Sequence, residues 1–183
     1  MNAIAVPTLL VRKEICLRNI EKMKQKAQQH GVELRPHFKT HQQHEVGRWF
    51  KQAGIEKIAV SSLRMAKYFA RDGWTDITVA FPLNVRETAL IDQLAQEITL
   101  NVLVENIEAI EGLKHATRNS LNVFIKVDTG YGRTGLSFEQ RDKIDELIVY
   151  IAGIGHLNFV GFLGHAGHSY KAQIGRASCR ERV

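Results

Sequence analysis

The alternation of short apolar runs with amphipathic segments of helical period constrains the fold of this chain most. The expected strands are Thr8–Val11, Val32–His37, Lys57–Val60, Asp76–Ala80, Thr99–Val104, Asn122–Val127 and Val160–Gly164. The expected helices are Lys13–His30, Gln42–Ala53, Leu63–Asp72, Arg86–Glu97, Asn106–Thr117 and Phe138–Ile151. Strands that are apolar throughout predict a parallel sheet buried on both faces. The pattern allows an open doubly wound sheet or a (β/α)8 barrel, and the close spacing of the strands suits the barrel.

Composition excludes several classes of protein. The chain has 183 residues, 44% hydrophobic and 24% charged, which is typical of one globular domain and not of a disordered chain. It has no apolar run of the roughly 18 residues that span a bilayer, and no signal peptide is evident. Cys16 and Cys179 are too few for a disulfide framework, so a cytoplasmic location is expected. The net charge of +6 is scattered, so neither nucleic acid nor membrane is an expected partner.

The last ten residues, 174–183, differ from the rest of the chain. The segment IGRASCRERV has no helical or strand period and no apolar face, and it holds Arg176, Arg180 and Arg182 against Glu181. It resembles the translation of a sequencing-adapter oligonucleotide read in frame, and such segments are excluded from fold reasoning. We therefore expect residues 1–173 to form the folded domain and residues 174–183 to be a non-native tail.

Candidate functional residues follow the expected strands. In both possible folds, ligands bind at the carboxyl ends of the strands. The segments there are rich in Lys, Arg, His, Tyr and Gly: residues 35–41, 126–135 and 164–170, with Ser61 and Ser62 after the third strand. The opposite ends carry no such cluster, so the sequence predicts a site at the carboxyl ends.

Lys39 is the first candidate within these segments. Partly desolvated and near Arg35, His37 and His41, its amine could lose a proton and form a Schiff base with a carbonyl, although most loop lysines are simply exposed. His37, His41 and His44 also allow a metal site, but no cysteine or pair of carboxylates completes a ligand set, and histidines without a metal are the preferred interpretation.

A second hypothesis concerns the glycine-rich loop. Gly130, Gly132 and Gly135 match the GxGxxG pattern of a dinucleotide-binding oxidoreductase. The loop follows the sixth strand rather than the first, and no acidic residue ends the next strand. Arg133 within the loop indicates instead a guanidinium directed at an anionic oxygen or a ring nitrogen. The glycines could also simply form a tight turn.

Three motifs carry a resemblance to a known family. The segments RPHFKTHQ, KVDTGYGRTG and GHAGHSY, in this order, resemble the N-terminal barrel of the D-threonine aldolase and D-serine dehydratase-like enzymes, which have the alanine racemase fold. The resemblance covers residues 6–170. It implies an α/β fold, a (β/α)8 barrel of the TIM type that is incomplete, with about seven βα units in this chain. It also implies pyridoxal 5'-phosphate as the cofactor.

The resemblance assigns roles to individual residues. Lys39 would form the internal aldimine with the cofactor, and Arg133 would hydrogen-bond the cofactor beside its ring. Tyr170 would face the cofactor as a catalytic residue. The remaining residues implied at the cofactor are His165, Ser169, Arg35 and His37.

The resemblance also implies the activity: a lyase or isomerase that acts on a small D-amino acid, in a homodimer when complete. The divalent metal of the aldolase and dehydratase branches would be bound only in the complete protein. We expect the 183-residue chain itself to be inactive. A non-catalytic pyridoxal-phosphate-binding barrel is the alternative from another class.

Overall fold

The computed structural model describes residues 5–6, 8 and 10–171, without the side chains of residues 170 and 171. Its helices are α1 (Lys13–Gln29), α2 (His44–Gln52), α3 (Leu63–Ala70), α4 (Thr88–Glu97), α5 (Ile107–Ala116) and α6 (Arg141–Ala152). Its strands are β1 (Lys57–Val60), β2 (Asp76–Pro82), β3 (Thr99–Val104), β4 (Leu121–Asp128), β5 (Leu136–Ser137) and β6 (Leu157–Gly164). Two short 3-10 helices are η1 (Phe38–Thr40) and η2 (Gly167–Lys171).

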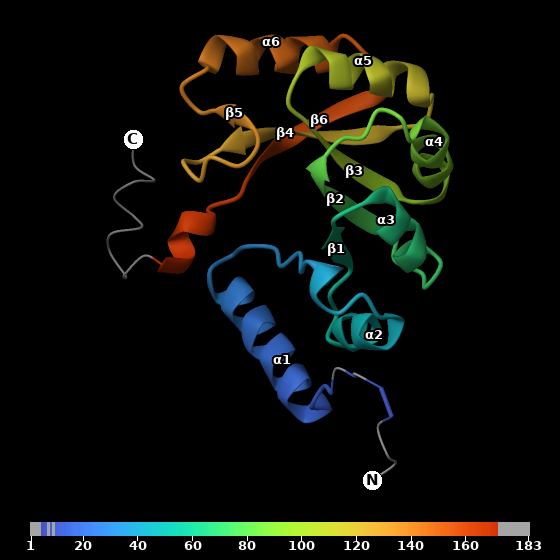
Figure 1. Ribbon diagram of the computed structural model, residues 1–183, viewed down its shortest axis with the longest axis vertical. Helices are drawn as coiled ribbons and strands as arrows, with labels where there is room; N and C mark the ends of the chain where they lie inside the picture. Colours follow the sequence, from blue (N-terminus) through green and yellow to red (C-terminus); the bar gives the residue numbers. More distant parts are fainter. Residues whose placement is uncertain (1–4, 7, 9, 172–183) are drawn as a thin grey trace.

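The strands form one parallel sheet in the order β1-β2-β3-β4-β6, and the two-residue β5 pairs with the end of β4. Figure 1 shows α3, α4, α5 and α6 as an arc outside the curved sheet, with α2 and α1 continuing the series. The helices α3, α4, α5 and α6 each lie between one long strand and the next, as in a barrel wall. The expected parallel α/β fold is confirmed, and the described strands form part of a barrel of the TIM type.

Two of the expected strands are not formed as predicted. In Thr8–Val11, the residues that the structure describes lie outside any strand. Val32–His37 lies beside β1 but makes a single bridge, between His37 and Ala59, and the Ala59 N–H donates to the Pro36 carbonyl at 2.9 Å. Pro36 has no N–H, so it cannot continue a hydrogen-bonded ladder.

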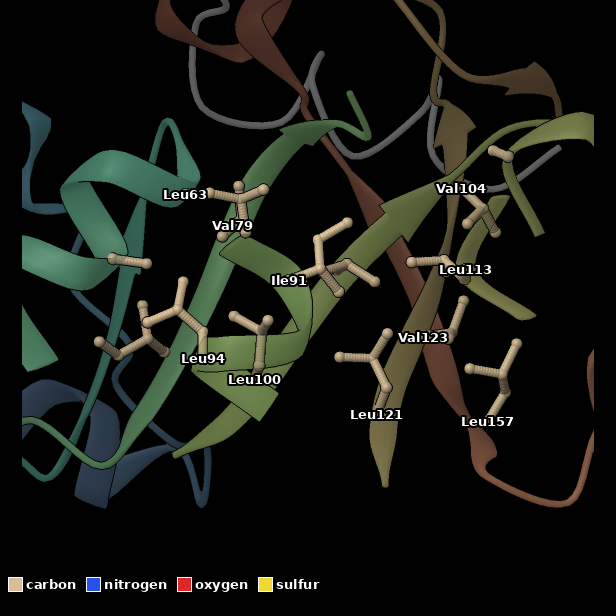
Figure 2. Close-up of a cluster of buried hydrophobic side chains, with 14 of the residues drawn as sticks. Leu63, Val79, Ile91, Leu94, Leu100, Val104, Leu113, Leu121, Val123 and Leu157 are labelled. Atoms are coloured by element: carbon tan, nitrogen blue, oxygen red, sulfur yellow. The ribbon is translucent and has the colours of Figure 1, made fainter. Parts of the chain in front are cut away.

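The apolar core lies between the sheet and the helices. Alternate strand residues such as Val79, Leu100 and Val123 point toward buried residues of the helices, among them Ile91 and Leu113. Figure 2 shows this layer as a continuous set of aliphatic side chains. Such burial supplies about 25 cal/mol per Å² of apolar surface, and it fixes which face of each strand is directed outward.

Local capping explains where the helices begin. The hydroxyl of Ser62 accepts from the backbone N–H of Met65 at 3.2 Å, and the side chain of Asn106 accepts from Ala109 at 2.8 Å. These caps start α3 and α5 near the expected residues. The helix expected from Arg86 starts instead at Thr88, because the Asn84 side chain accepts from the Arg86 N–H and holds a turn there. None of the described helices has the length and apolarity needed to cross a membrane.

Candidate active site

A cleft of about 330 Å³ opens at the carboxyl ends of β1, β2 and β4. Its lining consists of His37, Lys39, Ser61, Ala80, Phe81, Pro82, Lys126, Arg133 and Thr134. Three of these residues are cationic and none is acidic, so the cleft favours an anionic ligand. Lys39 and Arg133 come from two motifs far apart in the sequence, and the fold brings them to the same cleft.

The η1 turn presents Lys39 because Phe38 anchors it. The Phe38 side chain is fully buried, and its ring meets the rings of Phe69 and Trp74 edge-on at 4.9 and 5.1 Å. The neighbouring Lys39 is therefore directed out of the core, and its side chain is exposed. The sequence led us to expect a partly desolvated lysine. The difference arises because the described strands do not close around the cleft, so that one side is open to solvent.

His37 lies against the same turn. Its Nδ1 accepts a hydrogen bond from the backbone N–H of Lys39 at 3.3 Å. Burial lowers the pKa of the His37 imidazole to about 4, with smaller contributions from the charges of Lys39 and His165. His37 is therefore neutral near pH 7 and serves as an acceptor in the turn that carries Lys39.

The loop after β4 is organised by Asp128. Its carboxylate accepts from the backbone N–H groups of Gly130, Tyr131 and Gly132 at 2.9–3.1 Å. These bonds hold the pKa of Asp128 below its usual value. The ionised carboxylate fixes a tight turn that delivers Arg133 to the cleft, where its guanidinium also lies 5.8 Å from the ring centre of Tyr131.

The loop after β6 packs directly on that turn. A Cβ atom at Gly164 would lie 2.8 Å from Thr129, and one at Gly167 would lie 2.7 Å from the Tyr131 ring. Only glycine permits this approach without rearrangement. The two loops therefore form one unit at the rim of the cleft.

His165 belongs to this unit. It meets the Tyr131 ring edge-on, with the ring centres 5.4 Å apart. Burial lowers the pKa of His165, and the charges of Arg133, Lys39 and Lys126 lower it further. His165 thus lies within electrostatic reach of the cleft's cations without being part of its lining.

Two further residues of this segment were expected at the site. Ser169 is half-buried in η2, and its backbone N–H donates to the Ala166 carbonyl at 2.9 Å. It does not line the cleft in the described part of the chain. The side chain of Tyr170 lies outside the described residues, so its expected role remains a prediction.

Arg35 lies at the other end of the strands. Its guanidinium donates to Asp76 at 2.7 Å and to the Ile58 carbonyl at 3.3 Å, near the amino ends of β2 and β1. Asn101 donates to the same Asp76 oxygen at 2.8 Å, Asn122 donates to Asn101 at 3.1 Å, and Asn158 donates to Asn122 at 3.4 Å. The amino ends therefore carry a polar cluster of another kind, built mainly from Asn and Asp, which the sequence did not predict.

The other histidines of the proposed metal set, His41 and His44, pack against aromatic rings instead of forming a ligand set with His37. His41 packs among Phe38, Phe50 and Phe69, and burial lowers its pKa. His44 stacks on Tyr68 with ring centres 3.8 Å apart. Among the residues that the structure describes, no group of three or more His, Cys, Asp and Glu side chains could hold a metal ion.

The geometry of the glycine-rich loop does not suit a dinucleotide. The N–H groups of Gly130 and Gly132, which would face a pyrophosphate, already bond to Asp128. The helix after the loop, α6, begins only at Arg141, after β5. The loop thus lacks the direct entry into a helix N-terminus that pyrophosphate binding uses.

Lys126 and Thr134 belong to the candidate segment 126–135 but were assigned no role from the sequence, yet both line the cleft. The available signal was a lone lysine within an otherwise apolar buried strand, Asn122–Val127. A charged side chain is rarely buried without a specific role.

Comparisons with known proteins agree with this architecture. Residues 14–181 match the alanine racemase N-terminal domain. The chain is 34% identical to a D-serine dehydratase of Dictyostelium discoideum, over 94% of this chain and 47% of that protein. It is 29% identical to a 3-hydroxy-D-aspartate aldolase of Paracoccus denitrificans, over 96% of this chain and 49% of that protein. The solved structure of D-threo-3-hydroxyaspartate dehydratase from Delftia sp. HT23 superposes with a TM-score of 0.82 at 28% identity, covering 97% of this chain and 49% of that one. The chain thus spans about half the length of these relatives.

Proposed function

Because the chain belongs to the alanine racemase N-terminal domain family, we propose that it is the cofactor-binding part of a pyridoxal-phosphate-dependent lyase or isomerase acting on a D-amino acid. One observation carries the proposal: Lys39 and Arg133, from separate motifs, line the same cleft at the carboxyl ends of the parallel strands. An amine for the cofactor's aldehyde and a guanidinium for its oxygen or ring nitrogen are the groups that such a cofactor requires.

The residues of the cleft fit this cofactor. Lys39 projects from a turn anchored by Phe38, so that its amine can hold the aldehyde carbon. Ala80, Phe81 and Pro82 supply an apolar wall for a flat ring. Once bound, pyridoxal phosphate supplies an electron sink for negative charge at the Cα atom of an amino acid.

The other residues hold these groups in place. His37 is neutral and accepts from the Lys39 backbone N–H, so it stabilises the turn without adding positive charge. Arg35 acts at a distance, because its bonds to Asp76 and Ile58 fix the segment that leads into Lys39. We propose that His165 and Ser169 approach the cofactor from the loop after β6, and that Tyr170 faces it as the residue that moves a proton.

The relatives define the substrate class that we propose. Their names specify D-serine, 3-hydroxy-D-aspartate and D-threo-3-hydroxyaspartate, which are D-amino acids with a hydroxyl group on Cβ. We propose that the complete protein takes a D-β-hydroxy amino acid, in a homodimer, with a divalent metal held outside the residues described. The described sheet leaves one side of the cleft open, so we expect the 183-residue chain by itself to bind cofactor without turnover.

The first experiment adds pyridoxal phosphate to the purified chain, reduces the mixture with borohydride and maps the modified peptide by mass spectrometry. The expected result is a pyridoxyl group on Lys39, lost in Lys39→Ala and kept in Lys143→Ala. Lys143 is a suitable control because it is exposed on α6, away from the cleft. Equal modification of many lysines, or unchanged modification in Lys39→Ala, would exclude Lys39 as the cofactor lysine.

A further inference from the structure

Lys126 is a buried amine at the cleft that the proposed cofactor chemistry does not use. It lies on β4 between Ile125 and Val127, and its relative exposure is 4%. Ile125 belongs to the apolar core under the helices, so Lys126 points to the opposite face, where it lines the cleft. Burying an ammonium group is costly unless it gains partners.

The partners of Lys126 within the described chain are incomplete. Its Nζ donates one hydrogen bond, to the Val127 carbonyl at 3.1 Å, whereas an ammonium has three N–H groups. In the part of the chain that the structure describes, Lys126 forms no ion pair. Burial lowers the pKa of its amine, and the charges of Asp128 and Glu105 act in the opposite direction.

Two carboxylates lie near enough to influence Lys126, and neither is paired with it. Asp128 is occupied by the loop amides of Gly130, Tyr131 and Gly132. Glu105, just after β3, has a buried Oε1 without a hydrogen-bond partner in the described residues. Both favour the charged form of Lys126, and Arg133 opposes it. Two N–H groups of Lys126 therefore have no hydrogen-bond partner among the described residues, and the side chain that carries them lines the cleft.

The remaining lining completes an anion site. Arg133 and Lys39 add positive charge, Ser61 and Thr134 add hydroxyl donors, and the lining contains no carboxylate. We propose that Lys126 is an anion-binding residue of the cleft, which takes a carboxylate or phosphate group of the ligand. Anion binding by Lys126 does not depend on the proposed function. Only the identity of the anion rests on it: the carboxylate of the substrate or the phosphate of the cofactor.

The test measures anion binding without any cofactor. The purified chain is titrated calorimetrically, at constant ionic strength, with D-malate, propionate and inorganic phosphate, none of which has an amine. Lys126→Met should weaken binding of at least one anion by about tenfold or more, the range for one hydrogen bond to a charged group. Lys126→Arg should retain most of the affinity, and Lys143→Met should leave it unchanged. Preference for the carboxylates identifies the substrate end, and preference for phosphate identifies the cofactor.

A second measurement on the unmodified chain covers the case in which Lys126→Met does not fold. Amines are acetylated with a limiting reagent, and the extent at each lysine is read by mass spectrometry with and without the anion. The bound anion should protect Lys126 several-fold and leave Lys143 unchanged. Lack of saturable anion binding, equal loss in Lys143→Met, or lack of protection at Lys126 would overturn the proposal. Anion binding without a pyridoxyl group on Lys39 would instead contradict the proposed function alone.

Discussion

The two faces of the parallel sheet are built from alternate residues of the same strands, yet only the outer face is uniformly apolar. On the outer face, residues such as Ile77, Leu100 and Val123 are aliphatic, fully buried and covered by helices. On the inner face, the intervening residues include Asn101 and Lys126, which are equally inaccessible to water but polar or charged. Burial alone therefore does not separate the two faces. The outer face supplies cohesion, and the inner face places polar groups in fixed positions at both ends of the strands.

The largest expected effect comes from the outer face. Leu113→Ala removes a fully buried side chain of α5 from the core shown in Figure 2. We expect a loss of roughly 2–5 kcal/mol in the free energy of unfolding, from lost burial and the cavity left behind. Urea denaturation of the chain measures it. Val149→Ala, at a position 73% exposed on α6, is the matched control and should change stability by less than about 0.5 kcal/mol.

The inner face is tested next at Asp76. Asp76→Ala removes the carboxylate acceptor shared by Arg35 and Asn101, whose side chains keep only their longer bonds to backbone carbonyls. We expect a loss of roughly 1–3 kcal/mol in the free energy of unfolding. Asp145→Ala, on the exposed side of α6, should have almost no effect. Equal midpoints of urea unfolding for the two variants would show that the hydrogen bonds among Arg35, Asp76 and Asn101 add no stability.

The third prediction tests whether the position of Arg133 in the cleft depends on the backbone conformation at Gly135. Gly135 has φ +105°, and a Cβ atom there would lie 2.8 Å from the backbone of Val127 and Asp128. Gly135→Ala should cost roughly 1–2 kcal/mol through strain and displace the loop that carries Arg133. Gly130→Ala is the control, because its φ is also positive, +96°, but its Cβ would meet open space. Denaturation midpoints and the anion titration, measured on both variants, should show the larger change for Gly135→Ala.

The last expected effect is a pH dependence of the free energy of unfolding that arises from His37 and is confined to acidic pH. Its pKa is about 4 in the folded chain against an ordinary value of 6.5. Between these values the unfolded chain binds a proton that the folded chain does not, so stability falls as the pH is lowered from 6.5 to 4. Unfolding midpoints at pH 4.5 and 7 should differ less in His37→Gln than in the unmodified chain. His30→Gln, at an exposed position after α1, should keep the original difference.

The sequence predicted the outer face well and the inner face poorly, for a physical reason. Apolar runs such as Thr99–Val104 indicate buried strands, so five of the seven expected strands and their parallel arrangement follow from the pattern, whereas Thr8–Val11 and Val32–His37 do not form as predicted. Asn101 and Asn122 interrupt such runs, and their meaning depends on the register that places them side by side. Register is a property of the folded sheet and is not visible in a single strand.

The candidate site shows the same limit. The motifs identified Lys39, His37 and Arg133, and the structure places all three at one cleft. Arg35 stands in the same motif as Lys39 but binds Asp76 at the far end of the strands, since Arg35 lies in the extended segment beside β1 and Lys39 in the turn that follows it. Two residues that are close in the sequence can therefore lie at opposite ends of the parallel strands, because the extended segment between them runs along the strand direction.

The order of the strands has a consequence for synthesis. Each of the strands β2, β3, β4 and β6 pairs with the long strand made just before it, and α4, α5 and α6 each pack on the helix that precedes them. A nascent chain emerging from the ribosome can therefore add one strand and helix at a time to a growing edge, without waiting for a distant segment. Contacts that are close in sequence also favour rapid folding. Assembly in this part of the molecule can keep pace with translation.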